Sequence, residues 1–293
     1  MSRIIVTGAN GQLGSEIKKI EKKYPSFTFI YTDIDSLDLT DASLLESFIL
    51  AQKPDYLINC AAYTAVDKAE QDVKTAELVN ARVPGMLGLL ANKYRYHIVH
   101  ISTDYVFSGE FYRPLTESDP TQPASSYGKT KLEGERLLML ENEAIILRTS
   151  WLYSAFGNNF VKSMLRLGAE RKELGVVFDQ TGTPTAAGDL ADAIMHIISN
   201  HQANKEWHAG VYHFSNEGVC SWYDFAFEIM AFAGLNCKVK PILTREYQLP
   251  APRPAYSVLD KTRIKNTFKL EIPYWKESLY RVLEELKITK ATH

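Results

Sequence analysis

The chain has 293 residues, of which 45% are hydrophobic and 23% charged, and its formal net charge is −2. This near-neutral balance excludes the strongly basic character on which nucleic-acid-binding and membrane-surface proteins depend, so we expect no nucleic acid and no membrane as partner. The three cysteines show no local spacing pattern, which argues against a disulfide framework and against a zinc site. Because neither a signal sequence nor an apolar run of about 18 residues occurs, we expect a cytoplasmic protein.

The first half of the chain alternates short runs rich in Ile and Val with longer helical patterns. The runs lack polar/apolar alternation, which is typical of strands buried on both faces of a parallel sheet. The predicted strands are Arg3–Thr7, Phe27–Thr32, Tyr56–Cys60, His97–Ser102 and Ala144–Thr149, and the predicted helices between them lie near 12–23, 41–52, 75–94 and 126–141. This repetition predicts βαβ units and an α/β fold.

The second half is less regular. Predicted helices lie near 158–170, 186–200, 221–234 and 275–287, predicted strands near 175–178 and 211–214, and proline-rich loops at 119–123 and 250–254. We expect this half to form mainly a small lobe over the edge of the sheet, while segments near 186–216 return to the main domain.

A glycine-rich turn follows the first predicted strand. Its glycines, Gly8, Gly11 and Gly14, are spaced as G-x-x-G-x-x-G between a strand and a helix. Glycines in this turn let the backbone approach a pyrophosphate, and the free N–H groups of the helix N-terminus bind its charge. The turn therefore predicts a dinucleotide cofactor. The residues assigned to it are Gly8, Asn10, Gly11, Gln12, Leu13 and Gly14.

An acidic residue, Asp33, ends the second predicted strand, about twenty residues after the last turn glycine, where an acid binds the adenosine ribose in such sheets. Its carboxylate would accept hydrogen bonds from the ribose hydroxyls and repel a 2′-phosphate. Since Ile34, Asp35 and Ser36 bring no cation, we expect NADH to be preferred over NADPH.

Other candidate cofactor residues lie at the carboxyl ends of predicted strands, where open α/β sheets bind ligands. Asp38 and Leu39 could flank the adenine, and the small residues after the third strand would let a cofactor lie against the backbone, although close packing explains the alanines almost as well. These further residues are Asp38, Leu39, Ala61, Ala62, Tyr63, Thr64 and Ser102.

The candidate catalytic residues are Tyr127 and Lys131, which share one face of a predicted helix at spacing i, i+4. A ketone reduced by hydride needs a proton on its oxygen, and tyrosine can donate one if its pKa of about 10 is lowered. A lysine ammonium and the positive oxidised nicotinamide favour the tyrosinate. The lysine could also bind the nicotinamide ribose, and Thr103 could hydrogen-bond the same substrate oxygen.

With these residues in place, the sequence resembles the extended short-chain dehydrogenase/reductase family, and within it the dTDP-4-dehydrorhamnose reductases. The segments that carry the resemblance are Ile58–Glu70, Ser102–Phe107, Tyr127–Glu135, Arg148–Tyr153, Gly157–Phe160, Asp179–Thr185, Arg253–Pro254 and Ser257–Asp260. They cover nearly the whole chain. One departure is Cys60, where an alanine is common, and its small side chain should affect only packing.

The resemblance implies a Rossmann-type, doubly wound parallel sheet with a smaller C-terminal substrate-binding lobe. It implies an NAD(P)-binding domain at residues 1–150 and a substrate lobe made mainly from residues 151–293. It also implies reduction of the 4-keto group of dTDP-4-dehydro-6-deoxy-L-mannose by NADH or NADPH, giving dTDP-L-rhamnose. Thr103, Tyr127 and Lys131 would inherit the catalytic roles.

The sugar-nucleotide contacts are the other expectation. An aromatic side chain at Trp151 could stack on the sugar, Gln180 could bind the thymine, and Arg253 could grip the diphosphate. Each has a structural alternative. Trp151 could be a core tryptophan, Gln180 a loop amide and Arg253 a surface charge, and Asn159 could cap a helix. The expected contacts are Thr103, Asp104, Tyr105, Trp151, Asn159, Gln180 and Arg253. Trp207, Trp222 and Trp275 are expected to be structural.

Three questions stay open on the sequence. Some family members bind Mg²⁺, but no metal-ligand spacing occurs here, so no metal residue is assigned. The chain could be a monomer or a homodimer. Finally, a nucleotide-sugar epimerase or dehydratase, or a non-catalytic regulator like the regulatory subunit of methionine adenosyltransferase, would share the fold. Dehydratases usually carry an acidic pair after the strand-four threonine, and Tyr105 takes the place of the second acid.

Overall fold

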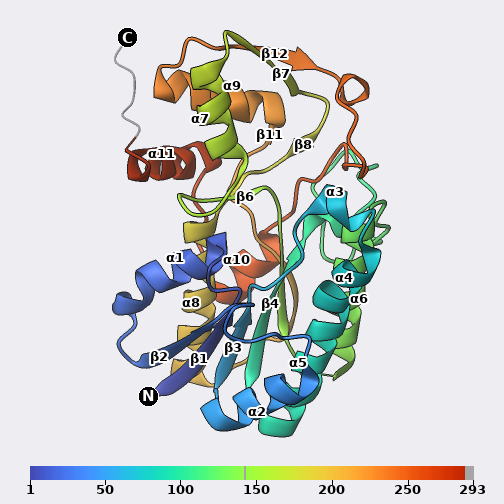
Figure 1. Cartoon of the computed structure of the whole chain (residues 1–293). Coiled ribbons are helices and arrows are strands. Elements are labelled where there is room, and N and C mark those ends of the chain that lie inside the picture. The colour runs from blue at the N-terminus through green and yellow to red at the C-terminus, as the bar shows by residue number, and fades with distance from the viewer. Residues whose placement is uncertain (142, 288–293) are drawn as a thin grey trace.

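The computed structural model describes residues 1–141 and 143–287, and its centre is a six-stranded parallel sheet in the order β10-β5-β4-β3-β1-β2 (Figure 1). The strands are β1 (Ser2–Thr7), β2 (Phe27–Thr32), β3 (Tyr56–Asn59), β4 (His97–Thr103), β5 (Ile145–Thr149) and β10 (Gly210–His213). Because β2 and β3 pair with opposite edges of β1, the strand order reverses there. The prediction of an α/β fold with a doubly wound parallel sheet is confirmed.

The sheet is buried on both faces, as its unalternating Ile/Val-rich strands predict. Ile4 and Val6 of β1 belong to one hydrophobic cluster, and Ile5 between them belongs to another. This follows from the two-residue period of a strand, which points successive side chains to opposite faces. Helices α1 (Gln12–Ile20) and α8 (Ala187–Asn204) contribute to the first cluster, and helices α2 (Ala42–Gln52), α5 (Val83–Tyr94) and α6 (Ser126–Glu141) to the second.

The second half of the chain forms a lobe above the carboxyl ends of the sheet strands (Figure 1). It has a hydrophobic core of its own, which includes Phe225, Ile229 and Leu279. Its main elements are α7 (Phe160–Glu170), α9 (Trp222–Ala233), α11 (Trp275–Glu285) and the parallel pair β7 (Glu173–Val177) and β12 (Lys238–Ile242). Open α/β sheets bind their ligands outside the carboxyl ends of their strands, which is the edge that this lobe faces.

Parts of the second half lie in the main domain. Strand β10 adds to the edge of the sheet beside β5, with Tyr212 opposite Leu147. Helix α8 packs on α1, and Leu190 and Ile194 of α8 are fully buried in the same cluster as Ile4. The chain therefore leaves the main domain after β5 and comes back to it before completing the lobe.

The helix expected at 75–94 is interrupted. It consists of α4 (Val73–Glu77), a π-helical stretch at Leu78–Arg82, and then α5. Proline is the physical reason, since Pro84 has no N–H to donate to the Asn80 carbonyl four residues earlier. That oxygen turns toward α6, where a side chain on Gly134 would meet it at 2.0 Å.

Several elements of the second half were not predicted, and β12 and α10 are the longest of them. Strand β12 carries Pro241, which makes its sequence read as a loop, but its edge position tolerates proline. Helix α10 (Thr262–Phe268) is too short for a clear period. The remaining short elements are α3 (Val66–Ala69), β6 (Leu152–Tyr153), β8 (Thr181–Gly182), β9 (Thr185–Ala186) and β11 (Cys220–Ser221). Among the described residues, no helix has the length and apolar character needed to cross a membrane.

Candidate active site

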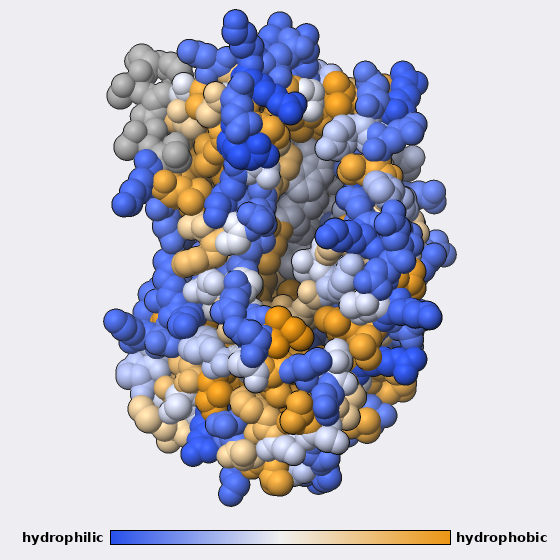
Figure 2. Space-filling model, in the orientation of Figure 1, coloured by the Kyte–Doolittle hydropathy of each residue, from blue (hydrophilic) through white to orange (hydrophobic). Residues whose placement is uncertain are grey.

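A cavity of about 880 Å³ lies between the carboxyl edge of the sheet and the lobe. Figure 2 shows the molecule hollowed between these two parts. Its size suits a cofactor and substrate together. The predicted site residues that line it are Gly8, Asn10, Gly11, Gln12, Leu13, Asp33, Asp38, Leu39, Ala61, Ala62, Tyr63, Thr64, Ser102, Thr103, Asp104, Tyr105, Tyr127, Lys131, Trp151 and Asn159.

The glycine turn forms one end of the cavity floor. Gly8 has a φ of +63°, and a side chain on it would lie 2.7 Å from the backbone nitrogen of Ala61. Gly8 therefore lets the turn after β1 touch the loop after β3. Helix α1 begins at Gln12 after Gly11, with no side chain capping it, so its first N–H groups are left for an anionic ligand. A pyrophosphate fits this backbone cradle.

Asp33 stands at the end of β2 beside the glycine turn. Its carboxylate accepts hydrogen bonds from the backbone N–H groups of Asn10 and Ile34, both at 2.8 Å. The same end of the cavity also carries Asp38. Among the described lining residues the single cation is Lys131 of α6, so the two carboxylates make this end of the cavity acidic.

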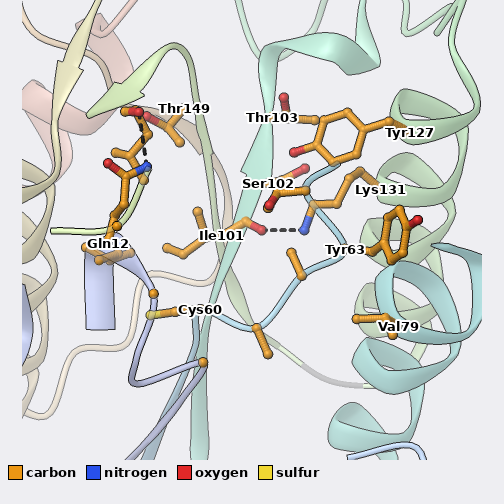
Figure 3. Close-up of a pocket in the computed structure, with 18 of the residues that line it drawn as sticks. Gln12, Cys60, Tyr63, Val79, Ile101, Ser102, Thr103, Tyr127, Lys131 and Thr149 are labelled. Atoms are coloured by element: carbon orange, nitrogen blue, oxygen red, sulfur yellow. Dashed lines mark hydrogen bonds between the residues drawn. The ribbon is translucent and has the colours of Figure 1, made fainter. Parts of the chain in front are cut away.

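Tyr127, in the first turn of α6, meets Thr103 at the end of β4 (Figure 3). The surrounding protein removes water from the phenol and raises the pKa of Tyr127 to about 12, and the nearby Asp104 also raises it. The hydrogen bond with Thr103 acts in the opposite direction. Tyr127 therefore carries its proton at neutral pH and can act as an acid.

Lys131 lies one helical turn after Tyr127, and its side chain is almost completely buried. Its Nζ donates a hydrogen bond of 2.6 Å to the carbonyl oxygen of Ile101 in β4 (Figure 3). Burial lowers the pKa of Lys131 to about 8, although Glu135 and Cys60 oppose this shift. The lysine is thus fixed in place beside the tyrosine and titrates near neutral pH.

Two more residues follow Thr103 at the end of β4. The carboxylate of Asp104 accepts a hydrogen bond of 3.1 Å from the Thr103 hydroxyl, and burial raises the pKa of Asp104 to about 6. The ring of Tyr105 packs edge-on against Tyr127, with 5.5 Å between the ring centroids. Both residues line the cavity next to Thr103 and Tyr127, and Asp104 is not followed by a second acidic residue because position 105 is a tyrosine.

Ser102 lines the cavity, but its hydroxyl donates to the buried carboxylate of Glu135. Arg148 of β5 binds the same carboxylate, with an Nη2–Oε2 distance of 2.6 Å, and both side chains are about 5% exposed or less. The three residues tie β4, β5 and α6 together. Because breaking a buried pair leaves an uncompensated charge, this network holds α6 in its place.

The lobe contributes an aromatic wall. The rings of Trp151 and Trp222 stack at a centroid distance of 3.6 Å, and both residues line the cavity. Trp151 has a φ of +48°, a strained conformation for a bulky residue. Asn159 caps α7 by accepting from the Lys162 N–H and also donates to Gln12 of the glycine turn at 3.0 Å. That contact joins the lobe to the cofactor turn.

The chain is similar to known proteins over nearly its whole length. The RmlD substrate binding domain family matches residues 2–288. A dTDP-4-dehydrorhamnose reductase of Aggregatibacter actinomycetemcomitans is 41% identical, with 96% of this chain and 98% of the relative covered. The crystal structure of a dTDP-4-dehydrorhamnose reductase from Clostridium acetobutylicum is 44% identical, with a TM-score of 0.92 and coverage of 97% and 99%. The enzyme of that name from Bacillus anthracis, solved in complex with NADP, is 38% identical, with a TM-score of 0.91 and coverage of 97% and 100%.

The chain belongs to the RmlD substrate binding domain family. The resemblance to dTDP-4-dehydrorhamnose reductases is thereby confirmed.

Three predicted site residues of this RmlD-family chain do not line the cavity. Gly14 is buried against its own turn, where a side chain would lie 2.6 Å from the Gly8 carbonyl oxygen. Gln180 donates to the Thr244 hydroxyl at 3.1 Å. Arg253 makes a two-pronged ion pair with Asp67, with both distances at 2.7 Å.

Sequence reasoning missed two positions, Trp222 and Asn80, that shape the cavity region of this member of the RmlD family. Trp222, predicted to be structural, lines the cavity. Asn80 is buried in the π-helical stretch, and its side chain bonds the Thr130 hydroxyl on α6 at 3.3 Å. An asparagine inside a helical pattern is a weak signal, but its position four residues before Pro84 could have indicated a break. Within residues 1–141 and 143–287, no group of three or more His, Cys, Asp or Glu side chains could hold a metal ion.

Proposed function

We propose that the chain is an NAD(P)H-dependent cytoplasmic reductase that acts on the 4-keto group of dTDP-4-dehydro-6-deoxy-L-mannose. The product would be dTDP-L-rhamnose, which makes this the last step of dTDP-rhamnose biosynthesis. The observation that carries the proposal is the meeting of Thr103, Tyr127 and Lys131 on a cavity whose other end is the glycine turn. The sugar nucleotide is supported by the names of the relatives.

The cavity suits a nicotinamide dinucleotide. The N–H groups at the start of α1 would bind the pyrophosphate, Asp33 the adenosine ribose, and Lys131 the nicotinamide ribose. When bound, the reduced nicotinamide supplies a hydride to the carbonyl carbon of the substrate.

Tyr127 is the proton donor in this mechanism. Its hydroxyl would transfer its proton to the carbonyl oxygen, while the Thr103 hydroxyl, after turning away from the Asp104 carboxylate, donates a second hydrogen bond to the same oxygen. The resulting tyrosinate is stabilised by the Lys131 ammonium, since a nearby opposite charge lowers a pKa by roughly one to three units. Burial of the lysine strengthens this interaction because little water screens it.

The lobe, mainly residues 151–293, would bind the sugar nucleotide. The stacked rings of Trp151 and Trp222 offer a flat apolar surface for the sugar. Asp104, Tyr105 and Asn159 would bind its hydroxyls. Gln180 and Arg253 would reach the thymine and the diphosphate only after leaving their present partners, Thr244 and Asp67.

NADH should be preferred over NADPH. The adenosine end of the cavity carries the carboxylates of Asp33 and Asp38, and the one lining cation among the described residues, Lys131, lies on α6 in the catalytic cluster. A 2′-phosphate would therefore meet like charge without a partner. The relative from Bacillus anthracis was solved with NADP, so the preference is one of degree.

The decisive experiment incubates the protein with dTDP-4-dehydro-6-deoxy-L-mannose and follows the oxidation of NADH and of NADPH separately. We expect both to be consumed, NADH more efficiently, with one dTDP-L-rhamnose formed per cofactor oxidised. Tightly held NAD without net consumption would indicate an epimerase instead. A stable complex with a synthetase and no turnover would indicate a regulator. Repeating the assay with EDTA, and weighing the protein by light scattering, would decide metal use and whether it is a monomer or a homodimer.

A further inference from the structure

Lys131 has a second neighbour on β4 that the mechanism above does not use. Its Nζ lies 3.4 Å from Nε2 of His100, which is long for a hydrogen bond, but both side chains are almost inaccessible to solvent. The carbonyl of Ile101 takes one of the three ammonium protons at 2.6 Å. The histidine ring is therefore the lysine's other fixed neighbour on the β4 side.

His100 is the middle of a buried chain of polar groups. Its Nδ1 lies 3.0 Å from the side-chain nitrogen of Asn59, and the Asn59 oxygen accepts a hydrogen bond of 2.7 Å from the Thr7 hydroxyl. The sheet register builds this chain, because Thr7 lies opposite Asn59 and Asn59 lies opposite His100 on neighbouring strands. The chain runs through β1, β3 and β4 and ends on the lysine of α6.

The ring of His100 is neutral. Complete burial and the neighbouring Lys131 hold the pKa of His100 well below its ordinary value. A neutral imidazole has one nitrogen that donates and one that accepts. Its Nε2 can therefore accept a hydrogen bond from an ammonium, or donate one from Nε2–H to a neutral amine.

Each protonation state of Lys131 matches one hydrogen-bonding arrangement of His100, Asn59 and Thr7. With Nε2–H facing a neutral lysine, Nδ1 accepts from the Asn59 amide and the Asn59 oxygen accepts from the Thr7 hydroxyl, which is the arrangement of this structure. With the lysine as ammonium, Nδ1–H donates to the Asn59 oxygen after the amide has turned over, and the amide nitrogen donates to Thr7. Every member of the chain stays hydrogen-bonded in both states, which a buried polar network requires.

We propose that His100 is a positioning residue for the reduction: its neutral ring, backed by Asn59 and Thr7, holds the Lys131 Nζ beside Tyr127 and gives the lysine a hydrogen-bonding partner in both of its protonation states. This inference rests on the proposed reductase function. Two other titratable groups act on the lysine, Cys60 from the loop after β3 and Glu135 from its own helix, and Tyr127 lies one helical turn before it. Cys60 and Glu135 cannot switch between donating a hydrogen bond to the lysine and accepting one from it as His100 can, because Cys60 stays a neutral thiol and Glu135 is bound to Arg148.

The first test reads the histidine ring directly and needs no substrate. The ¹⁵N shifts of His100, assigned from the signal that is lost in His100→Gln, report which ring nitrogen carries the proton. We expect the proton to move from Nδ1 to Nε2 as Lys131 loses its charge near pH 8, following its lowered pKa of about 8. In Lys131→Met the ring should keep one tautomer throughout. A wild-type ring that keeps one tautomer across this range, or that becomes charged, overturns the proposal.

The second test uses turnover. His100→Leu removes the ring nitrogens at similar volume, so kcat should fall at least about tenfold. The hydrogen bond of the ring to the ammonium is stronger than its bond to the neutral amine, so its loss should move the alkaline limb of the pH profile down by roughly one pH unit. His100→Gln keeps an amide oxygen facing the lysine and should restore the limb. An unshifted limb and unchanged kcat in a folded, NADH-binding His100→Leu protein contradict the proposal. If that variant does not fold, the ring measurement decides. If the wild type reduces no keto sugar, the reductase proposal fails while the ring measurement still stands.

Discussion

The side chain of Asn80 is bonded to both backbone polar groups of Tyr63. Its oxygen accepts from the Tyr63 N–H at 2.8 Å, and its nitrogen donates to the Tyr63 carbonyl at 3.1 Å. Asn80 is about 1% exposed and belongs to the π-helical stretch before α5, while Tyr63 lines the cavity after β3. Such π-helical insertions occur frequently at functional sites. Here the insertion fixes the loop that forms one wall of the cofactor cavity.

Asn80→Leu should destabilise the protein and loosen that wall. The substitution leaves two partly buried backbone groups of Tyr63 without their side-chain partner, so the free energy of unfolding should fall by about 1–3 kcal/mol. The Kd for NADH should rise at the same time. Urea unfolding and fluorescence titration measure both quantities. Asn266→Leu, at an exposed position of α10, is the matched control and should change stability by less than about 0.5 kcal/mol. Equal behaviour of the two variants would contradict the role of Asn80.

Tyr127→Phe should lower kcat by about 10²–10⁴-fold, because the proton donor is removed while the ring remains. The Kd for NADH should change little. The control is Tyr153→Phe, since the Tyr153 hydroxyl is buried away from the cavity and has no hydrogen-bond partner in the described part of the chain. Steady-state kinetics and cofactor titration are the measurements. Wild-type turnover in Tyr127→Phe would remove Tyr127 from the mechanism.

The pH profile of kcat should fall on its alkaline side near pH 8. Burial lowers the pKa of Lys131 to about 8, so the ammonium is present below that pH and is lost as the pH rises through it. The tyrosinate that forms during proton transfer then loses its stabilising charge. In Lys131→Arg the group stays charged, so this limb should move to higher pH even if kcat is lower. A limb that stays at the same pH in this variant would assign it to another group.

Asp33 should decide between the two cofactors. Asp33→Asn combined with Ile34→Arg removes a carboxylate and adds a guanidinium at the adenosine end, so the ratio of kcat/KM for NADPH over NADH should rise about tenfold or more. Asp35→Asn changes an exposed acid that does not line the cavity and should leave the ratio unchanged. Parallel kinetics with the two cofactors give the answer. An unaltered ratio in the double variant would place the specificity elsewhere.

Arg253 can be tested through its ion pair with Asp67. If Arg253 also binds the substrate diphosphate, Arg253→Lys should raise the KM for the dTDP-sugar several-fold, because lysine cannot bind phosphate in a two-pronged way. Asp67→Asn removes the ion pair but leaves the guanidinium, so its KM should not rise. If both variants lower the melting temperature equally and neither changes KM, Arg253 is only structural.

Much of the candidate site could be predicted from short-range patterns in the sequence. Two patterns depend only on local turn and helix geometry and not on the rest of the fold. They are the spacing of Gly8, Gly11 and Gly14 and the i, i+4 relation of Tyr127 and Lys131. The Ile/Val-rich runs predicted all the central strands of the first half for the same reason. Strand β12 was not predicted, because its own sequence pattern is not strand-like and only its pairing with β7 makes it a strand.

Other properties depend on contacts between residues far apart in the chain. Asn80 bonds Tyr63 and Thr130, and Trp222 lines the cavity while it stacks on Trp151. None of these long-range contacts leaves a periodic pattern in the sequence. The lysine shows the division most clearly. Its presence at position 131 and its spacing from Tyr127 are written in the sequence, whereas its pKa near 8 and its contact with His100 come from burial between α6 and β4, which only the packed fold creates.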